Sequence, residues 1–326
     1  MNMHLAALPH ELLDPKDCPF AKDVIAGLSQ QPKRLSPKYF YDETGSKLFE
    51  QITLLPEYYP TRTELRILRD CGAQIAAAIP ENAALIEFGA GATTKVRLLL
   101  QSCTLSAYIP VDISGDFLND QTDDLRRDFS DLAVYPVTAD FTTPFELPPE
   151  VKDMPKVGFF PGSTIGNFDP HEASAFLRSA RAILGDGATL IIGVDLEKDE
   201  RVLYDAYNDA AGVTAKFNLN MLVRINRDLG ANFDLSGFKH RAIYNRDRHR
   251  IEMHLISRKA QTVRLLGQTF SFHTGETIHT ESSYKYSLER FAALARGAGW
   301  ESRETWTDPD GMFSVHALVA KPEPKT

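Results

Sequence analysis

The sequence has few cysteines and no long apolar run. Its 326 residues include three cysteines, Cys18, Cys71 and Cys103, without Cys-x-x-Cys spacing. This small, odd number excludes a disulfide framework and a Cys-x-x-Cys metal site, and it predicts free thiols in a reducing compartment. No apolar run approaches the roughly 18 residues that a transmembrane helix needs. The N-terminal residues also lack the basic and then apolar pattern of a signal peptide. We therefore expect a cytoplasmic protein without a membrane partner or a bound metal.

Positive charge is also scarce. The chain has 36 Lys and Arg against 44 Asp and Glu, a net charge of −8, and a pI near 5.6. Because nucleic-acid binding needs a basic face, this balance argues against a nucleic-acid partner. The one basic cluster, at 239–250, is broken by Tyr, Asn and Asp and is typical of a solvated turn. The length predicts one large domain or two closely associated domains.

Strand and helix patterns alternate from residue 63 to about 196. The helical patterns cover 63–80, 94–100, 114–128 and 171–184, and the strand patterns cover 84–88, 107–111, 133–138, 157–160 and 189–194. Alternation of this kind predicts an α/β fold with a doubly wound, mostly parallel sheet that is covered on both faces.

After residue 196 the pattern changes. Two helices are expected at 200–217 and 218–229, a polar turn at 230–236, and antiparallel strands at 242–245, 250–257 and 262–272. A helix at 288–298 and a strand at 314–320 then resume the first pattern. The sequence therefore predicts a doubly wound domain of 63–196 and 286–326, with a second, α+β domain of 1–62 and 197–285.

A glycine loop follows the first strand. Gly89-Ala90-Gly91 comes directly after 84–88 and precedes a helical pattern, so bare backbone is expected at the carboxyl end of a strand. A lone Gly-x-Gly is weak evidence, and the third glycine of a dinucleotide-binding fingerprint is missing. No phosphate-binding Gly-Lys-Ser/Thr loop is present. The loop fits S-adenosylmethionine, which has no pyrophosphate to bind.

Other strand ends offer polar groups that suit the same ligand. Glu87 and Asp112 provide acceptors for ribose hydroxyls, and Asp140 followed by Phe141 provides an acceptor and a ring for adenine. The fourth strand leads into 162–167, which begins with Gly162. Taken alone, each of Asp112 and Asp140 is explained about equally well as a helix or turn cap and as a ligand-binding residue. Their order along successive strand ends favours a ligand site.

Several longer motifs resemble the histidine-specific Nα-methyltransferases of ergothioneine biosynthesis. They lie at 39–42, 56–64, 162–167, 205–214, 250–253 and 281–283, and the resemblance runs from about residue 23 to residue 320. It implies a Rossmann-like class I methyltransferase domain with a separate substrate-binding domain. It also implies S-adenosylmethionine as methyl donor and S-adenosylhomocysteine as product.

The resemblance implies a role for each matched residue. The donor-binding residues are Tyr41, Gly89, Lys95, Asp112, Asp140, Phe141 and Gly162, with Tyr41 near the reacting end. The histidine-binding residues are Tyr58, Asn167, Tyr207, Thr214, Met253, Glu281 and Ser283. Tyr41 and Asn167 are the two expected to take part in catalysis. These residues also have non-functional interpretations: Lys95 as a solvent-facing lysine, Met253 as a core residue and Glu281 as a surface charge.

The chemistry of these residues suits free L-histidine. Tyrosine hydroxyls bind a carboxylate, Asn167 orients the amine without holding it as an ammonium, and Glu281 and Ser283 pair with the two ring nitrogens. Three methyl transfers would give hercynine. The alternatives are a relative that methylates another amino acid such as a tryptophan derivative, a binding protein without activity, and a nicotinamide-dependent oxidoreductase. We expect a monomer.

Overall fold

The computed structural model describes residues 18–113 and 115–322. The expectations for the first residues, and the predicted helix start at Ser114, fall outside these ranges. The chain forms two compact units: unit 1 comprises Met1–Leu48, Gly212–Ala242 and Met253–Glu281, and unit 2 comprises Phe49–Ala211, Ile243–Glu252 and Ser282–Thr326. Residues 49–62 and 197–211, which we predict to serve substrate binding, group with unit 2. The functional division into two domains stays a prediction.

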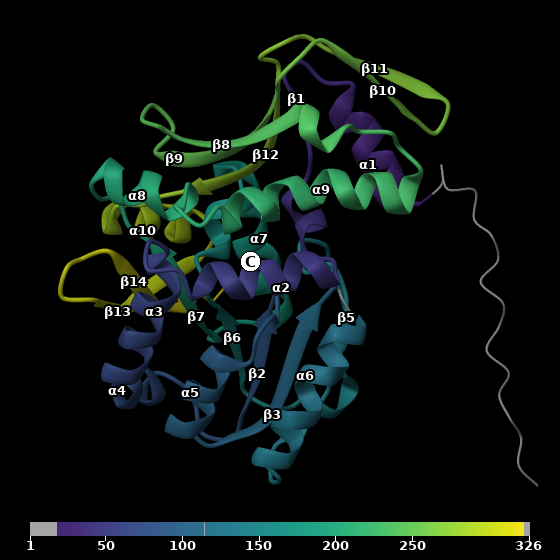
Figure 1. Cartoon of the computed structure of the whole chain (residues 1–326). Coiled ribbons are helices and arrows are strands. Elements are labelled where there is room, and N and C mark those ends of the chain that lie inside the picture. Colours follow the sequence, from purple (N-terminus) through teal and green to yellow (C-terminus); the bar gives the residue numbers. More distant parts are fainter. Residues whose placement is uncertain (1–17, 114, 323–326) are drawn as a thin grey trace, which may run out of the picture. The chain divides into compact units, whose positions relative to one another are not determined.

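Unit 2 contains an eight-stranded, mostly parallel sheet (Figure 1). Its strands are β2 (Ala83–Phe88), β3 (Leu105–Asp112), β4 (Ala133–Val134), β5 (Val137–Thr138), β6 (Lys156–Phe160), β7 (Thr189–Asp195), β13 (Trp300–Thr307) and β14 (Phe313–Ala320). The order is β13-β14-β7-β6-β2-β3-β4, with β5 also paired to β3. Among the described residues, the antiparallel pairs of this sheet are β13 with β14 and β14 with β7, and the other pairs are parallel. The predicted doubly wound sheet is confirmed.

Helices cover both faces of this sheet because its central strands are apolar on both sides. Every residue of β2 is buried, as expected for a parallel strand between two helical layers. On one face, α3 (Tyr59–Asp70), α4 (Gly72–Ala77), α5 (Thr94–Ser102) and α6 (Gly115–Asp128) share a core with Leu85 and Phe159. On the other face, α7 (Pro170–Leu184) and α10 (Leu288–Gly297) pack against Ile86 and Phe160.

Helix boundaries in unit 2 follow local start and stop residues. An Asp169/Glu172 capping box and Pro170 begin α7, and Gly185, at φ +91°, ends it. The predicted single helix over 63–80 is wrong, because it breaks at Cys71 into α3 and α4. Gly72, which disfavours a helix interior, lies at this break. A hypothetical Cβ on Gly72 would also lie 2.9 Å from the Ser102 hydroxyl.

Two further predicted boundaries are corrected. The strand expected over 133–138 is two short strands, β4 and β5, because Pro136 between them has no N–H for the ladder. The helices expected at 200–217 and 218–229 are α8 (Glu200–Tyr207) and α9 (Val213–Leu229). The break falls at Asn208, which ends α8, and at Gly212, which has φ +69°. Short 3₁₀ helices η3 (Pro149–Val151) and η4 (Thr164–Asn167) lie in unit 2.

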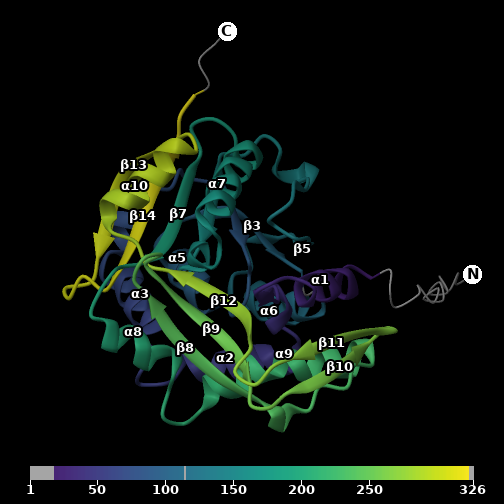
Figure 2. The same cartoon turned by 90° about the horizontal axis from the view of Figure 1, so that it is seen from above.

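A four-stranded sheet runs in the order β1-β12-β9-β8, and its strands β12, β9 and β8 lie side by side in Figure 2. Its strands are β1 (Lys33–Arg34), β8 (Phe238–Asn245), β9 (Arg250–Ser257) and β12 (Thr277–Tyr284), and the last three begin or end in unit 2. The strand predicted over 262–272 is a hairpin of β10 (Gln261–Leu265) and β11 (Gln268–Phe272). Leu266 and Gly267 both have positive φ, which is typical of a two-residue hairpin turn. No pattern had indicated β12.

The helices of unit 1 are α1 (Pro19–Leu28), η2 (Pro37–Phe40), η5 (Leu235–Gly237) and α9, together with the first part of α2 (Glu43–Thr53). The Phe40 and Phe217 rings stack at 4.5 Å between centroids and thereby join η2 to α9. Among the described residues, no helix has the length and apolarity to cross a membrane.

Candidate active site

The glycine loop lies at the carboxyl end of β2, where it was predicted. The Gly89 N–H and the Ala90 N–H both donate to the Val111 carbonyl of β3, at 2.8 and 3.0 Å. Gly89 has φ +75°, which disfavours any side chain there. At Gly91 a hypothetical Cβ meets no atom within 4 Å. The loop therefore presents bare backbone with open space beside it, as a nucleoside-like ligand needs.

Lys95 and Gly162 meet at one buried carboxylate. The Glu64 side chain, 1% exposed, pairs with the Lys95 ammonium at 2.6 Å. Both Glu64 oxygens also accept the Gly162 N–H at 2.9 Å. Two predicted donor-binding residues from different segments are thus held together by a third residue. The alternative interpretation of Lys95 as a solvent-facing lysine is wrong, because only 18% of its side chain is exposed. An ammonium has three N–H groups, so Lys95 retains donors for a ligand carboxylate.

Phe141 lies against the glycine loop. A hypothetical Cβ on Gly89 would be 3.2 Å from the Phe141 ring, and that ring makes edge contacts with Phe160 and Phe176. The preceding Asp140 caps a turn, because its Oδ1 accepts the Thr142 N–H at 3.0 Å. Capping does not prevent ligand binding, since a carboxylate has two oxygens and about four acceptor positions.

The two other strand-end carboxylates differ in exposure. Asp112 ends β3 and is partly exposed, as a ribose acceptor must be. Glu87 is 3% exposed, and its Oε2 accepts the Tyr108 O–H at 2.5 Å. Burial raises the pKa of the Glu87 carboxyl to about 7, although the Tyr108 hydrogen bond and the Lys95 charge oppose that rise. The structure therefore gives the Glu87 carboxylate a protein partner where the sequence suggested a ribose hydroxyl.

Three predicted histidine-binding residues of unit 2 lie together around Tyr207. The Tyr207 hydroxyl donates to Ser283 Oγ at 2.8 Å, and the Tyr58 and Tyr207 rings make an edge contact at 6.2 Å between centroids. All three residues are at most 9% exposed. Tyr58 lies directly before α3, Tyr207 ends α8 and Ser283 lies in β12, so the fold brings together residues that are far apart along the chain.

Asn167 ends the short helix η4, which follows β6. Ser163, just before η4, has φ +55°, and its hydroxyl accepts the Asp195 N–H at 2.9 Å. Gly166 leaves room for the backbone of β12, because a Cβ there would lie 2.8 Å from the Tyr284 carbonyl oxygen. This close approach places the Asn167 segment beside the strand end that carries Ser283.

The remaining predicted residues lie in unit 1. Tyr41 follows η2, and its ring makes an edge contact with Phe217 of α9 at 5.8 Å. Thr214 is buried in the first turn of α9. Met253 is 2% exposed on β9, and its carbonyl accepts the Thr280 hydroxyl of β12 at 3.1 Å. Glu281 follows Thr280 and is partly exposed.

Sequence reasoning missed a buried ionic cluster at the end of β7. Asp195 is paired with Lys285 at 2.7 Å and with Lys198 at 2.6 Å, and Tyr59 donates to it. Lys285 also donates to Ser283 and Tyr207. A signal was available, because Asp195 directly follows the fifth strand pattern, at 189–194, and the rule that ligands bind at strand ends had been applied to only four strands.

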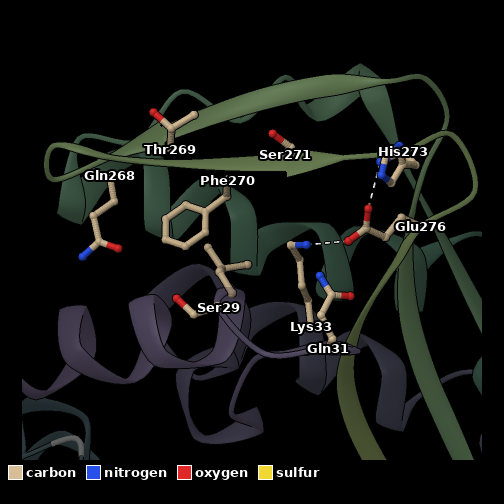
Figure 3. Close-up of a pocket in the computed structure, with 10 residues that line it drawn as sticks. Ser29, Gln31, Lys33, Gln268, Thr269, Phe270, Ser271, His273 and Glu276 are labelled. Atoms are coloured by element: carbon tan, nitrogen blue, oxygen red, sulfur yellow. Dashed lines mark hydrogen bonds and ion pairs between the residues drawn. The ribbon is translucent and has the colours of Figure 1, made fainter.

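A groove in unit 1 holds none of the predicted site residues (Figure 3). Its volume is about 670 Å³, and its polar lining includes Lys33, His273 and Glu276. The Lys33 ammonium pairs with Glu276 at 2.5 Å, and the His273 N–H donates to the same carboxylate at 2.8 Å. Since its buried charges neutralise each other, we assign no ligand to this groove.

Comparison with known proteins shows which class of enzyme this arrangement belongs to. The profile of a family described as histidine-specific, SAM-dependent methyltransferases matches residues 20–320. The histidine N-alpha-methyltransferase of Mycolicibacterium smegmatis is 42% identical over 308 residues, which cover 91% of this chain and 94% of that protein. The protein of the same name from Mycobacterium tuberculosis is 39% identical over 310 residues, covering 92% and 94%.

One solved structure, an S-adenosylmethionine-dependent methyltransferase from Clostridium acetobutylicum, aligns with 85% of this chain and 99% of its own. Its TM-score of 0.49 and identity of 10% are too low to support a conclusion. The sequence matches suffice. The chain belongs to the histidine-specific, S-adenosylmethionine-dependent methyltransferase family. It is a methyltransferase with a Rossmann-like class I fold, and its methyl donor is S-adenosylmethionine.

Proposed function

We propose that this enzyme methylates the α-amine of free L-histidine three times, giving hercynine, a step toward ergothioneine. The observation that carries the proposal is the 42% identity, over 91% of the chain, to a protein named histidine N-alpha-methyltransferase. The proposed product keeps the imidazole ring unmodified and carries a trimethylammonium group.

The donor-binding roles are assigned to residues at the strand ends of unit 2, together with Tyr41 of unit 1. The backbone at Gly89 and Gly162 lies along the donor, Asp112 accepts from the ribose, and Asp140 and Phe141 bind the adenine. Lys95 pairs with the carboxylate of the donor. The open space at Gly91 and the held Lys95 ammonium support this fit. When bound, S-adenosylmethionine supplies an electrophilic methyl group on a sulfonium.

The histidine-binding roles are divided between the units. In unit 2, Tyr58 and Tyr207 face the substrate carboxylate, and we assign Tyr58 as its hydrogen-bond donor, because the Tyr207 proton is given to Ser283. Asn167 accepts from the amine, and Ser283 meets a ring nitrogen. In unit 1, we assign Glu281 to the other ring nitrogen, with Thr214 and Met253 lining the ring. Glu281 and Ser283 are two residues apart on β12, so the alternation of a strand directs their side chains to the same face. Pairing both ring nitrogens would reject phenylalanine or leucine strongly.

Methyl transfer requires a neutral amine in line with the S–CH₃ bond. Holding the two reactants in that geometry removes several kcal/mol of barrier. An amine with a pKa near ~8 or above is mostly protonated at neutral pH, so a proton must leave first. We assign its removal to water or a tyrosine hydroxyl, with Tyr41 and Asn167 positioning the amine. Tyrosine and phenylalanine faces tolerate the growing cation.

The test is incubation of the purified protein with S-adenosylmethionine and a panel of free amino acids that includes histidine and tryptophan. Mass spectrometry should show one to three added methyl groups on histidine, with fragmentation placing them on the α-nitrogen. Methyl groups on the imidazole, or a preference for tryptophan, would refute the proposal.

A variant separates substrate binding from donor binding. Glu281→Ala should reduce histidine turnover at least tenfold while thermal stabilisation by S-adenosylmethionine persists. If donor stabilisation collapsed equally, Glu281 would be a structural residue. We further propose a cytoplasmic monomer that binds neither nucleic acid nor membrane, and gel filtration of the same samples checks the monomeric state.

A further inference from the structure

Lys285 is a fully buried lysine whose three donors are all used. It is 0% exposed and follows the end of β12. Its ammonium lies 2.7 Å from Asp195 Oδ2, 2.8 Å from Ser283 Oγ and 3.2 Å from the Tyr207 hydroxyl. Removing an ammonium from water costs several kcal/mol, which only a well-matched set of partners offsets. The ammonium of Lys285 is therefore fixed in direction as well as in place.

Asp195 does not depend on Lys285 alone for its charge balance. Lys198 pairs with Asp195 Oδ1 at 2.6 Å, and the Tyr59 hydroxyl donates to Asp195 Oδ2 at 2.7 Å. Burial opposes ionisation, yet the charges of Lys285 and Lys198 together lower the pKa of the Asp195 carboxyl. A variant without the Lys285 ammonium would leave Asp195 paired with Lys198, so it is not expected to leave an uncompensated buried carboxylate.

Ser283 receives two hydrogen bonds in this cluster. The Tyr207 O–H donates to Ser283 Oγ at 2.8 Å, and Lys285 donates to the same oxygen at 2.8 Å. A serine hydroxyl has two acceptor lone pairs and one proton. Both lone pairs are therefore occupied, and the remaining capacity of Ser283 toward a ligand is that of a donor.

We infer that Lys285 is a positioning residue that sets Ser283 as a hydrogen-bond donor, so that the enzyme selects histidine with a neutral imidazole ring. The inference rests on the proposed function, in which Ser283 meets a ring nitrogen. A neutral imidazole has one unprotonated nitrogen that accepts a hydrogen bond. An imidazolium carries N–H on both nitrogens, so one of them would face the Ser283 proton.

The consequence is that histidine must lose two protons, one from the amine and one from the ring, before it reacts, and this should show in the acid part of the pH profile of kcat/KM. The α-amine must already lose one proton, which gives log kcat/KM a slope of 1 against pH. Below the ring pKa of about 6.5, the need for a neutral ring should steepen this slope to 2. At pH 5.5 the additional loss should be about tenfold, because about one ring in ten is then neutral.

Groups around the cluster do not account for such a change. The described charged and titratable groups near Lys285 include Asp195, Lys198, Tyr59, Tyr207, Tyr244 and His249, together with Glu197, which pairs with His249, and Asp308, which acts on Lys198. The pKa of Asp195 lies below its ordinary value, burial lowers that of Lys198 to about 8, and burial raises those of Tyr59 and Tyr244. These four do not change charge between pH 5 and 6.5. His249, Glu197, Asp308, Tyr207 and the ring partner Glu281 are present in the wild type and in both lysine variants described below, so the comparison does not differ in these groups.

The experiment compares Lys285→Met with a matched control, Lys198→Met. Each substitution replaces a buried lysine that pairs with Asp195 by an uncharged side chain of similar length. Of the two lysines, only Lys285 contacts Ser283. With saturating donor, kcat/KM for histidine is measured from pH 5 to 8.5. Wild type and Lys198→Met should show the slope of 2 below pH 6.5. Lys285→Met should keep a slope near 1, because Ser283 regains a lone pair that accepts from an imidazolium.

Tyr207→Phe removes the other donor to Ser283 and should lose the second slope in the same way. If Lys285→Met fails to fold, the Tyr207→Phe variant tests the inference in its place. Melting temperature and stabilisation by S-adenosylhomocysteine show whether each variant is folded. Parallel acid limbs in wild type and in the folded Lys285 or Tyr207 variant would overturn the inference but leave the proposed function standing. A wild-type enzyme that does not methylate histidine would overturn both.

Discussion

Replacing Glu87 by glutamine should stabilise the enzyme at alkaline pH. Glu87 lies in the central strand β2, is 3% exposed and accepts the Tyr108 O–H. Burial raises the pKa of its carboxyl from 4.5 to about 7. Between these two values the folded protein binds a proton that the unfolded chain has lost. Stability therefore falls as the pH rises through this range, and the loss is complete above about pH 7.

The size of the effect follows from the same two values. The pKa of the Glu87 carboxyl rises on folding from 4.5 to about 7, which is about 2.5 pH units. Each unit corresponds to about 1.4 kcal/mol, so the ionised Glu87 carboxylate lowers the stability by about 3 kcal/mol. Glutamine keeps an oxygen for Tyr108 but has no charge. Between pH 5 and 8.5, wild type should therefore lose about 2.5 kcal/mol that Glu87→Gln retains.

Urea denaturation of both proteins at the two pH values measures this difference. Any constant cost of burying the glutamine amide cancels, because only the change with pH is compared. Glu81→Gln, at an exposed position just before β2, is the matched control and should follow wild type. If the stability difference between Glu87→Gln and wild type were equal at pH 5 and 8.5, the assignment of a raised pKa to Glu87 would be refuted.

Two further predictions concern the donor-binding residues. Gly89→Ala should cost about 1–2 kcal/mol of stability, because φ is +75° and the new methyl would press on Phe141; it should also weaken stabilisation by S-adenosylmethionine. Gly91→Ala, which meets open space, should leave stability nearly unchanged in a thermal melt, and equal losses in the two would contradict this reasoning. Glu64→Gln removes the charge that holds Lys95, so the KM for the donor should rise about tenfold while that for histidine changes less than twofold. An unchanged donor KM would show that Lys95 needs no such support.

The sequence predicted the central sheet well because its signals are local. Continuous apolar runs of five or six residues define buried parallel strands, and the glycine loop follows directly from one of them. The errors lie where a single residue overrides periodicity: Gly72 within a helical pattern, Pro136 within a strand pattern, and Gly267 at a hairpin turn. Strand β12 was missed although it carries Glu281 and Ser283, because polar residues dominate its second half.

The family motifs gave the identity of the site residues, and tertiary structure gave their surroundings. Nothing local in the sequence pairs Glu64 with Lys95 and Gly162, which lie 31 and 98 residues away. The same holds for Lys285, whose charged side chain is fully buried.

The sequence by itself therefore determined the fold class, the methyl donor and the family, because strand periodicity, a glycine loop and long motifs are all properties of short segments. Only the tertiary structure decided which groups are charged, buried and paired. Hydrogen bonds and ion pairs such as Asp195 with Lys285 join residues 90 positions apart, and their strength depends on the exclusion of water. Local sequence patterns give neither the distance between such residues nor their exposure to water.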